Sequence, residues 1–177
     1  LIAGFLGGDL SKAAMWYGWF ATVFMLMQFV FSPIQGALSD HFGRRPVILL
    51  SNFGVGVDFL FMAMVNTLPL LFIGRIVSGI TAASFSTASA YIADVTPPEK
   101  RAQAFGMIGM AFGIGFVVAP AIGGWLGMLH PRLPFWIAAG LSLTNFCYGL
   151  FVLPESLPPE RRSAFSWARA NPMAALR

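Results

Sequence analysis

The long runs without a charged residue constrain this chain more than any other feature of its sequence. No Asp, Glu, Lys or Arg occurs between Lys12 and Asp40, and none occurs between Arg101 and Arg132. A bilayer core requires about 20 predominantly apolar residues for each helix that crosses it. The spacing of the charges therefore predicts five transmembrane helices, at residues 16–39, 46–66, 70–93, 102–128 and 133–153.

The overall composition supports an all-α integral membrane protein whose first partner is the lipid bilayer. The chain is 57% hydrophobic and 10% charged, whereas about a quarter of the residues in soluble domains are charged. Residues 1–8, LIAGFLGG, are expected to be the outer end of an earlier helix. We therefore interpret residues 1–153 as an incomplete transmembrane bundle in a fragment, and residues 154–177 as a cytoplasmic loop or tail.

The basic residues gather on one side of the predicted membrane. One side holds Arg44, Arg45, Lys100, Arg101, Arg161, Arg162, Arg169 and Arg177. The other side holds Lys12 and Arg132. An excess of Lys and Arg marks cytoplasmic loops, so the first side is predicted to be cytoplasmic. The net charge of +4 is then explained by topology, and a nucleic-acid partner is not expected.

The sequence gives no support for an enzyme, a metal site or a cofactor. Cys147 is the single cysteine and falls within a predicted span, which excludes a disulfide within the chain. His41 and His130 are predicted on opposite sides of the membrane, so they do not share a metal ion. HExxH, Walker and Cys-x-x-Cys motifs are absent from the sequence.

Three motifs resemble those of the major facilitator superfamily. The stretch 36-GALSDHFGRRP-46 resembles the signature between helices two and three, and 75-RIVSG-79 resembles the signature of helix four. The helix-five pattern of drug–proton antiporters is matched by Gly106, Gly115, Pro120, Gly123 and Gly124, with Ala119 where that pattern usually has Gly. The phrases GALSDHFGRRPVILL, IGRIVSGIT and AYIAD are most similar to the tetracycline efflux branch.

This resemblance implies a helical bundle that is one part of a larger transporter. Members of the family have twelve helices in two halves around a central cavity. The chain would then supply helices two to six and the end of helix one, and its missing C-terminal half would be a partner. The resemblance also implies a multi-pass protein of the bacterial inner membrane.

The charged loop after the first complete span is predicted to form a cytoplasmic gate. Asp40 and Arg44 are four residues apart, a spacing that allows an ion pair on a helix. Asp94 ends a later span on the same side. Gly36 allows a close helix approach and Gly43 a tight reversal. The family analogy makes this cluster, with Arg45, a latch that opens and closes; simple anchoring by the arginines is the alternative.

Asp58 and Arg75 interrupt two apolar spans at similar depth. Asp58 lies about 18 Å beyond Pro46 along a helix, and Arg75 lies about 9 Å in from Pro69. A charge at the centre of a membrane helix is costly, so we expect the two to face the interior and to be coupled. They are candidates for proton coupling, with protons as the coupling ion. A static pair that only neutralises both charges is the alternative.

Other residues suggest packing or a cavity. Small residues at helical spacing, such as Gly79 and Ser86 on one span and Gly115 on another, predict close helix contacts. Gln28 and Asn145 are predicted near the membrane midplane, where transporter substrates bind. For each of these two residues there are two interpretations: its side chain lines the cavity, or it forms a hydrogen bond between helices.

The function predicted from this resemblance is proton-coupled export of a small amphiphilic drug, similar to tetracycline, by alternating access. A multidrug or metabolite porter of the same superfamily is the nearest alternative. A membrane protein that transports nothing is a more distant one.

Overall fold

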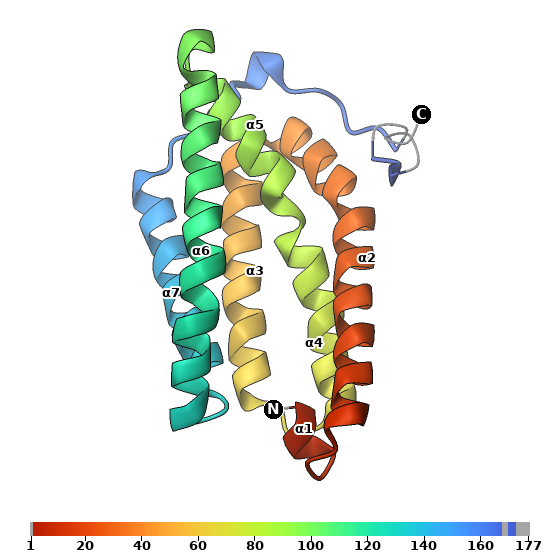
Figure 1. Cartoon of the computed structure of the whole chain (residues 1–177). Helices are drawn as coiled ribbons and strands as arrows, with labels where there is room; N and C mark the ends of the chain where they lie inside the picture. Colours follow the sequence, from red (N-terminus) through yellow and green to blue (C-terminus); the bar gives the residue numbers. More distant parts are fainter. Residues whose placement is uncertain (1, 168–169, 173–177) are drawn as a thin grey trace.

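The computed structural model describes residues 2–167 and 170–172, and these residues form helices joined by short connections (Figure 1). In chain order the elements are α1 (Ile2–Phe5), α2 (Leu10–Phe42), α3 (Arg44–Met64), α4 (Leu68–Thr81), the 3₁₀ turn η1 (Ala82–Ser84), α5 (Phe85–Val95), η2 (Pro98–Lys100), α6 (Arg101–Leu129), α7 (Leu133–Val152) and η3 (Pro159–Arg161).

Five helical segments in the described part are long and apolar enough to cross a membrane. They are Leu10–Phe42, Arg44–Met64, Leu68–Val95, Pro98–Leu129 and Leu133–Val152. The predicted all-α membrane fold is therefore confirmed, and so is the number of spans. The segment Leu68–Val95 differs from the prediction of one continuous helix because η1 separates α4 from α5.

The helices pack as two close pairs, α3 with α7 and α2 with α4. Glycine brings α3 and α7 together, since a Cβ added at Gly56 would lie 2.7 Å from Leu143 Cδ2. A buried apolar cluster of Phe20, Met62, Val65 and Leu71 joins α2, α3 and α4 near the end of the bundle that carries α1. These contacts fix the frame on which the charged residues are placed.

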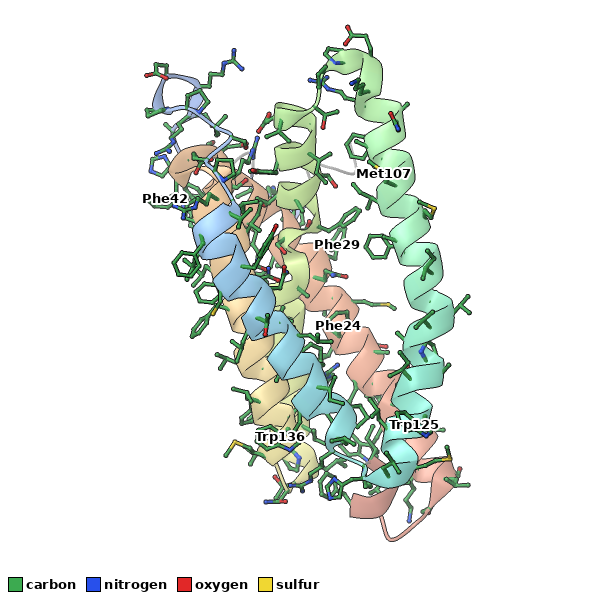
Figure 2. All side chains as sticks on the ribbon, turned by 90° about the vertical axis from the view of Figure 1, so that its left-hand side faces the viewer. Phe24, Phe29, Phe42, Met107, Trp125 and Trp136 are labelled. Carbon is green, nitrogen blue, oxygen red and sulfur yellow. The ribbon has the colours of Figure 1, made fainter. Side chains whose placement is uncertain are left out.

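α6 stands apart from α2, α3 and α4, with a gap visible between the ribbons in Figure 2. A Cβ added at Gly115 or Gly123 would meet nothing within 4 Å. Apolar side chains such as Met107 and Trp125 project from this helix and are more than half exposed. The close packing predicted for its small residues thus has no partner helix in the described part of the chain.

The two ends of the bundle differ in their polar residues. The chain turns at Gly43 and at residues 96–100 at one end, where the segment after α7 also crosses over α5 and α2 (Figure 1). This is the end predicted to be cytoplasmic, and it carries six of the eight basic residues predicted there. The other two, Arg169 and Arg177, lie outside the described residues, as does part of the predicted tail at residues 154–177.

Candidate functional site

The charges at the predicted cytoplasmic end form one connected cluster around Arg44. Its Nη1 donates to Asp40 Oδ1 at 2.5 Å and to Ser39 Oγ at 2.7 Å. Its Nε donates to Asp94 Oδ2 at 3.3 Å, although Asp94 is 50 residues further along the chain. The structure therefore brings together the end of α2, the start of α3 and the end of α5, as the gate prediction requires.

A carboxylate that sequence analysis did not identify completes this cluster. Glu155, just after α7, accepts hydrogen bonds from the backbone amides of Arg44 at 2.8 Å and Arg45 at 3.3 Å. These are the first amides of α3, which lack partners within the helix. A negative group is stabilised at this position by the helix dipole. Glu155 thus caps α3 and ties the segment after α7 to the turn that carries Arg44.

Two backbone features shape the same turn. Gly43 adopts φ +107° and ψ 159°, a conformation that is essentially restricted to glycine. A Cβ at Gly43 would also overlap the Glu155 carboxylate and lie 3.1 Å from Arg162 Nη2. Gly36 has a looser role, because an added Cβ there would lie 3.9 Å from Ser86 Oγ.

Further contacts hold the segment after α7 across the end of α2. The Ser163 amide donates to the Asp40 carbonyl oxygen at 3.0 Å, and His41 Nδ1 lies 3.2 Å from the Ser163 carbonyl oxygen. Arg45 is not part of the carboxylate cluster through its side chain. Its Nη2 donates to the Leu150 carbonyl oxygen at 2.6 Å, and so links α3 to α7.

Asp58 on α3 and Arg75 on α4 face each other inside the bundle, as their depth in the sequence predicted. Asp58 Oδ2 lies 3.9 Å from Arg75 Nη2 and accepts a hydrogen bond from Ser78 Oγ. Arg75 Nη2 also lies 2.9 Å from Met62 Sδ. Asp58 is 4% exposed, and its Oδ1 and Arg75 Nε are buried without a hydrogen-bond partner. The pair is close but incompletely satisfied.

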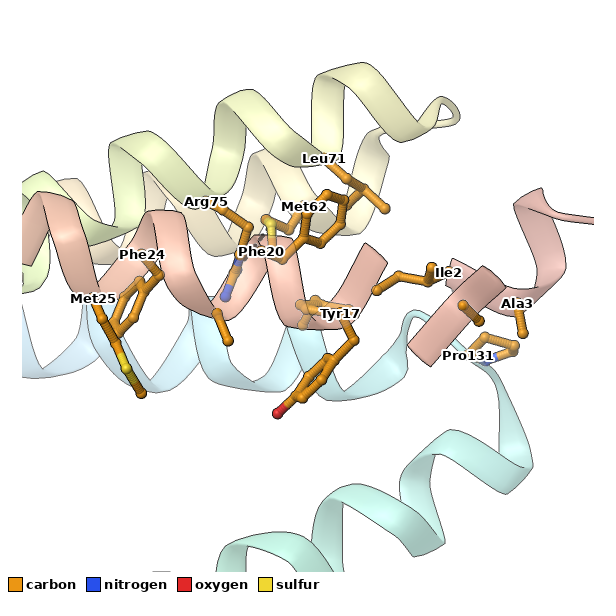
Figure 3. A pocket seen from close by; sticks show the side chains of 13 residues that line it. Ile2, Ala3, Tyr17, Phe20, Phe24, Met25, Met62, Leu71, Arg75 and Pro131 are labelled. Atoms are coloured by element: carbon orange, nitrogen blue, oxygen red, sulfur yellow. Dashed lines mark hydrogen bonds between the residues drawn. The ribbon is translucent and has the colours of Figure 1, made fainter. Parts of the chain in front are cut away.

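Arg75 lines a cavity of about 640 Å³ between α1, α2, α3, α4 and the start of α7. Figure 3 shows its guanidinium among apolar side chains that include Phe20, Phe24 and Met25, with the Tyr17 ring on the same side. Cavities that hold small molecules have about 300–1,000 Å³, mostly apolar walls and a few polar groups. This cavity has the size and lining of a site for an amphiphilic molecule.

The two polar residues predicted near the midplane have different surroundings. Gln28 Nε2 donates to the Ala82 carbonyl oxygen at 3.3 Å, and Gln28 also lines a second cavity with Phe29, Ser32 and Phe85. Asn145 is exposed on α7 and is not among the lining residues of this cavity or of the one beside Arg75. Its role in a substrate cavity stays a prediction.

The residues of the helix-five pattern all lie on α6. Gly115, Ala119 and Pro120 line an apolar groove of about 640 Å³ with Phe112 and Phe116. Gly106 and Gly124, like Gly123, have no side chain or backbone of another segment within 4 Å of an added Cβ. The antiporter role of this pattern stays a prediction.

No group of three His, Cys, Asp or Glu side chains in residues 2–167 and 170–172 is placed to hold a metal ion. Sequence analysis also missed Ser78, the partner of Asp58, and Gln35, whose Nε2 donates to the Ile80 carbonyl oxygen at 2.5 Å. Polar residues at helical spacing on neighbouring spans were the available signal for both.

The comparisons with known proteins agree with this architecture. The family model described as Major Facilitator Superfamily matches residues 1–177. A tetracycline resistance protein of class C from Escherichia coli is 44% identical over 175 residues, which cover 93% of this chain and 44% of the relative. A class E protein from Escherichia coli is 42% identical over 79% of this chain and 35% of the relative.

A solved structure supports the same conclusion. The crystal structure of the human organic anion transporter MFSD10 (TETRAN) superposes with a TM-score of 0.82 and 28% sequence identity, covering 99% of this chain and 48% of that one. The chain thus spans less than half the length of the relatives it matches. With its five apolar helices and its charged turn, this chain belongs to the Major Facilitator Superfamily.

Proposed function

We propose that this chain forms the first half of a transporter that exports a tetracycline-like drug in exchange for protons, by alternating access across the bacterial inner membrane. The observation that carries this proposal is the 42–44% identity to tetracycline resistance proteins over most of the chain. Because the chain spans less than half of those relatives, the remaining half is a required partner.

The cluster around Arg44 would act as the cytoplasmic gate. Arg44 bonds to Asp40 on the preceding helix and to Asp94 on α5. Ion pairs open to water are each worth about 0–1 kcal/mol, and these two pairs are partly open, since their carboxylates are 40% and 31% exposed although Arg44 is 13% exposed. Contacts of that strength suit a latch, since rocking of the two halves needs only to shift a small difference between two states.

Asp58 and Arg75 would carry the coupling between drug and proton. No cofactor is proposed apart from the proton as coupling ion. The buried carboxylate has one oxygen bonded by Ser78 and one without a partner. A small movement of α4 would change its distance from Arg75 and the stability of its charge. This makes protonation of Asp58 responsive to conformation, which proton-driven export requires.

The cavity beside Arg75 would receive the drug on this half of the transporter. Its apolar wall suits the ring system of an amphiphile, and the guanidinium suits a polar oxygen at its edge. The match to the organic anion transporter MFSD10 favours a second candidate, a porter of other organic anions. A multidrug exporter would need the same apolar wall and the same polar group in this half of the transporter.

Transport by the complete protein in inside-out vesicles tests the proposal. We expect tetracycline uptake that depends on an imposed proton gradient and stops when an uncoupler is added. Asp58→Asn is expected to abolish the dependence on the gradient. Asp9→Asn changes a half-exposed acid that caps α2 and is expected to retain it.

Three results would count against parts of the proposal. Uptake that an uncoupler leaves unchanged would exclude proton coupling, and normal coupling in Asp58→Asn would remove Asp58 from the proton path. Uptake of several unrelated drugs, or of organic anions without tetracycline, would replace the narrow substrate by one of the alternatives.

A further inference from the structure

The span from Leu68 to Val95 is interrupted near its middle, where the 3₁₀ turn η1 separates α4 from α5. A 3₁₀ turn pairs each amide with the carbonyl three residues back, whereas an α-helix uses the carbonyl four back. The pattern therefore changes on entering and on leaving η1, and at such a change a carbonyl oxygen loses its usual amide donor or shares one. In a bilayer core no water is present to complete the bonding of such a carbonyl, so a side chain or another segment has to do so.

Three polar side chains from two neighbouring helices supply donors at this junction. The pairs are Gln35 Nε2 with the Ile80 carbonyl oxygen at 2.5 Å, Ser51 Oγ with that of Thr81, and Gln28 Nε2 with that of Ala82 at 3.3 Å. The acceptors are three consecutive residues, two at the end of α4 (Ile80 and Thr81) and one at the start of η1 (Ala82). The two glutamines come from α2 and the serine from α3.

The local sequence also favours a break at this point. Thr81 Oγ1 donates back to the Val77 carbonyl oxygen at 3.0 Å, a bond that often bends helices. Two glycines allow neighbouring helices to reach the junction. A Cβ at Gly54 on α3 would lie 2.6 Å from Thr81 Cγ2, and one at Gly79 would lie 2.6 Å from the Phe24 carbonyl oxygen on α2.

The break divides the span into halves that carry different functional groups. The outer half, α4, carries Arg75, which lies beside Asp58. The inner half, α5, ends next to Asp94, whose carboxylate accepts from Arg44 Nε at 3.3 Å. Because α5 starts from the break, the geometry of the break determines where Asp94 lies relative to Arg44.

We propose that Gln28, Gln35 and Ser51 are positioning residues, which hold the break open and thereby orient α5 so that Asp94 reaches Arg44. This inference rests on the proposed gate. It gives a reason for polar side chains within apolar spans, where Ser51 is 5% exposed. Without these donors, the junction loses the conformation that carries Asp94 to the gate.

The test measures the gate in the complete transporter by distance between two spin labels. Labels are placed at Leu50 on α3 and Val95 on α5, both more than half exposed, after replacement of native cysteines. The test variants are Gln28→Met, Gln35→Met and Ser51→Ala, singly and together. Gln103→Met and Ser11→Ala, at exposed positions, are the matched controls.

We expect the triple variant to shift the distance distribution away from that of the closed gate. Hydrogen bonds between membrane helices typically shift an equilibrium by about threefold each, so three of them are expected to shift it about 27-fold. Each single variant is expected to shift it about threefold, which keeps the test informative if the triple variant does not insert. Both controls are expected to retain the original distribution.

A second measurement separates positioning of Asp94 from general loosening of the bundle. If the three residues act through Asp94, adding Asp94→Asn to the triple variant is expected to change the distribution little further. The proposal would be overturned if the effects of the triple variant and of Asp94→Asn were independent and additive. It would also be overturned if the ratio of closed to open gate in the triple variant stayed within about twofold of the original ratio. Because labels are measured without drug, a wrong substrate assignment leaves this result unaffected.

Discussion

At the scale of single residues, Gly43 is the position with the least freedom to change. Its φ of +107° is unfavourable for a residue with a side chain. The same position faces the Glu155 carboxylate, which caps the first amides of α3. A side chain at position 43 would therefore both strain the backbone and displace the Glu155 carboxylate that caps α3.

Gly43→Ala is expected to lower the stability of the complete transporter, measured by its thermal unfolding in detergent. The strained backbone costs about 1–3 kcal/mol, and loss of the cap adds about 0.5–2 kcal/mol. Gly8→Ala is the control, because Gly8 has φ +87° but nothing within 4 Å of an added Cβ. Equal losses in the two variants would show that Glu155 contributes nothing at this turn.

Sequence spacing predicted two of the ion pairs. Asp40 and Arg44 pair as expected, although α2 ends at Phe42 and the two residues lie on successive helices rather than on one. Asp58 and Arg75 meet because the number of helical residues between each of them and the membrane surface places both at a similar depth in the bilayer. Glu155 was missed because it follows α7 in a segment without helical periodicity, and there spacing gives no direction.

At the scale of elements, α4 and α2 come into backbone contact at Gly79, next to the break. A Cβ there would lie 2.6 Å from both Met27 Cβ and the Phe24 carbonyl oxygen. Backbone in direct contact leaves no space to relax by a change of rotamer. The small-residue pattern that predicted packing for this span is therefore explained by contact with α2.

Gly79→Ala is expected to separate α4 from α2 and to destabilise the transporter by about 1–3 kcal/mol, the usual cost of overpacking. Gly18→Ala on α2 is the control, since an added Cβ at Gly18 meets nothing within 4 Å. Thermal unfolding of both variants checks the prediction. A loss at Gly18 as large as that at Gly79 would contradict the close approach.

The number of spans was predictable, and so were most of their ends, but the start of the first span at Leu10 rather than at residue 16 was not. The break between Thr81 and Phe85 was not predictable either. Hydrophobic length reports where a helix enters and leaves lipid. The break depends on donors from α2 and α3, such as Gln35 and Ser51. Those contacts arise only from tertiary packing, and the periodicity of one segment does not show which other segments pack against it.

At the scale of the whole molecule, the bundle has one end rich in ionic contacts and one with few. The end predicted to be cytoplasmic carries the Arg44 cluster. At the other end, Arg132 donates to the carbonyl oxygens of Ala63 and Val65, and so joins α7 to the end of α3. The isolated position of α6 was not predicted, since the order of spans does not specify which ones touch.

The orientation of this bundle in the membrane is the claim on which the proposed gate and the proposed direction of export both depend. Single cysteines are to be placed at Phe42, where α2 ends, and at Leu129, where α6 ends; both positions are exposed, and these two helix ends lie at opposite ends of the bundle (Figure 1). They are to be labelled with a membrane-impermeant maleimide in the complete transporter. We predict labelling at position 42 in inside-out vesicles only, and labelling at position 129 in intact cells. Labelling of position 42 in intact cells would place the arginine cluster outside and contradict the account.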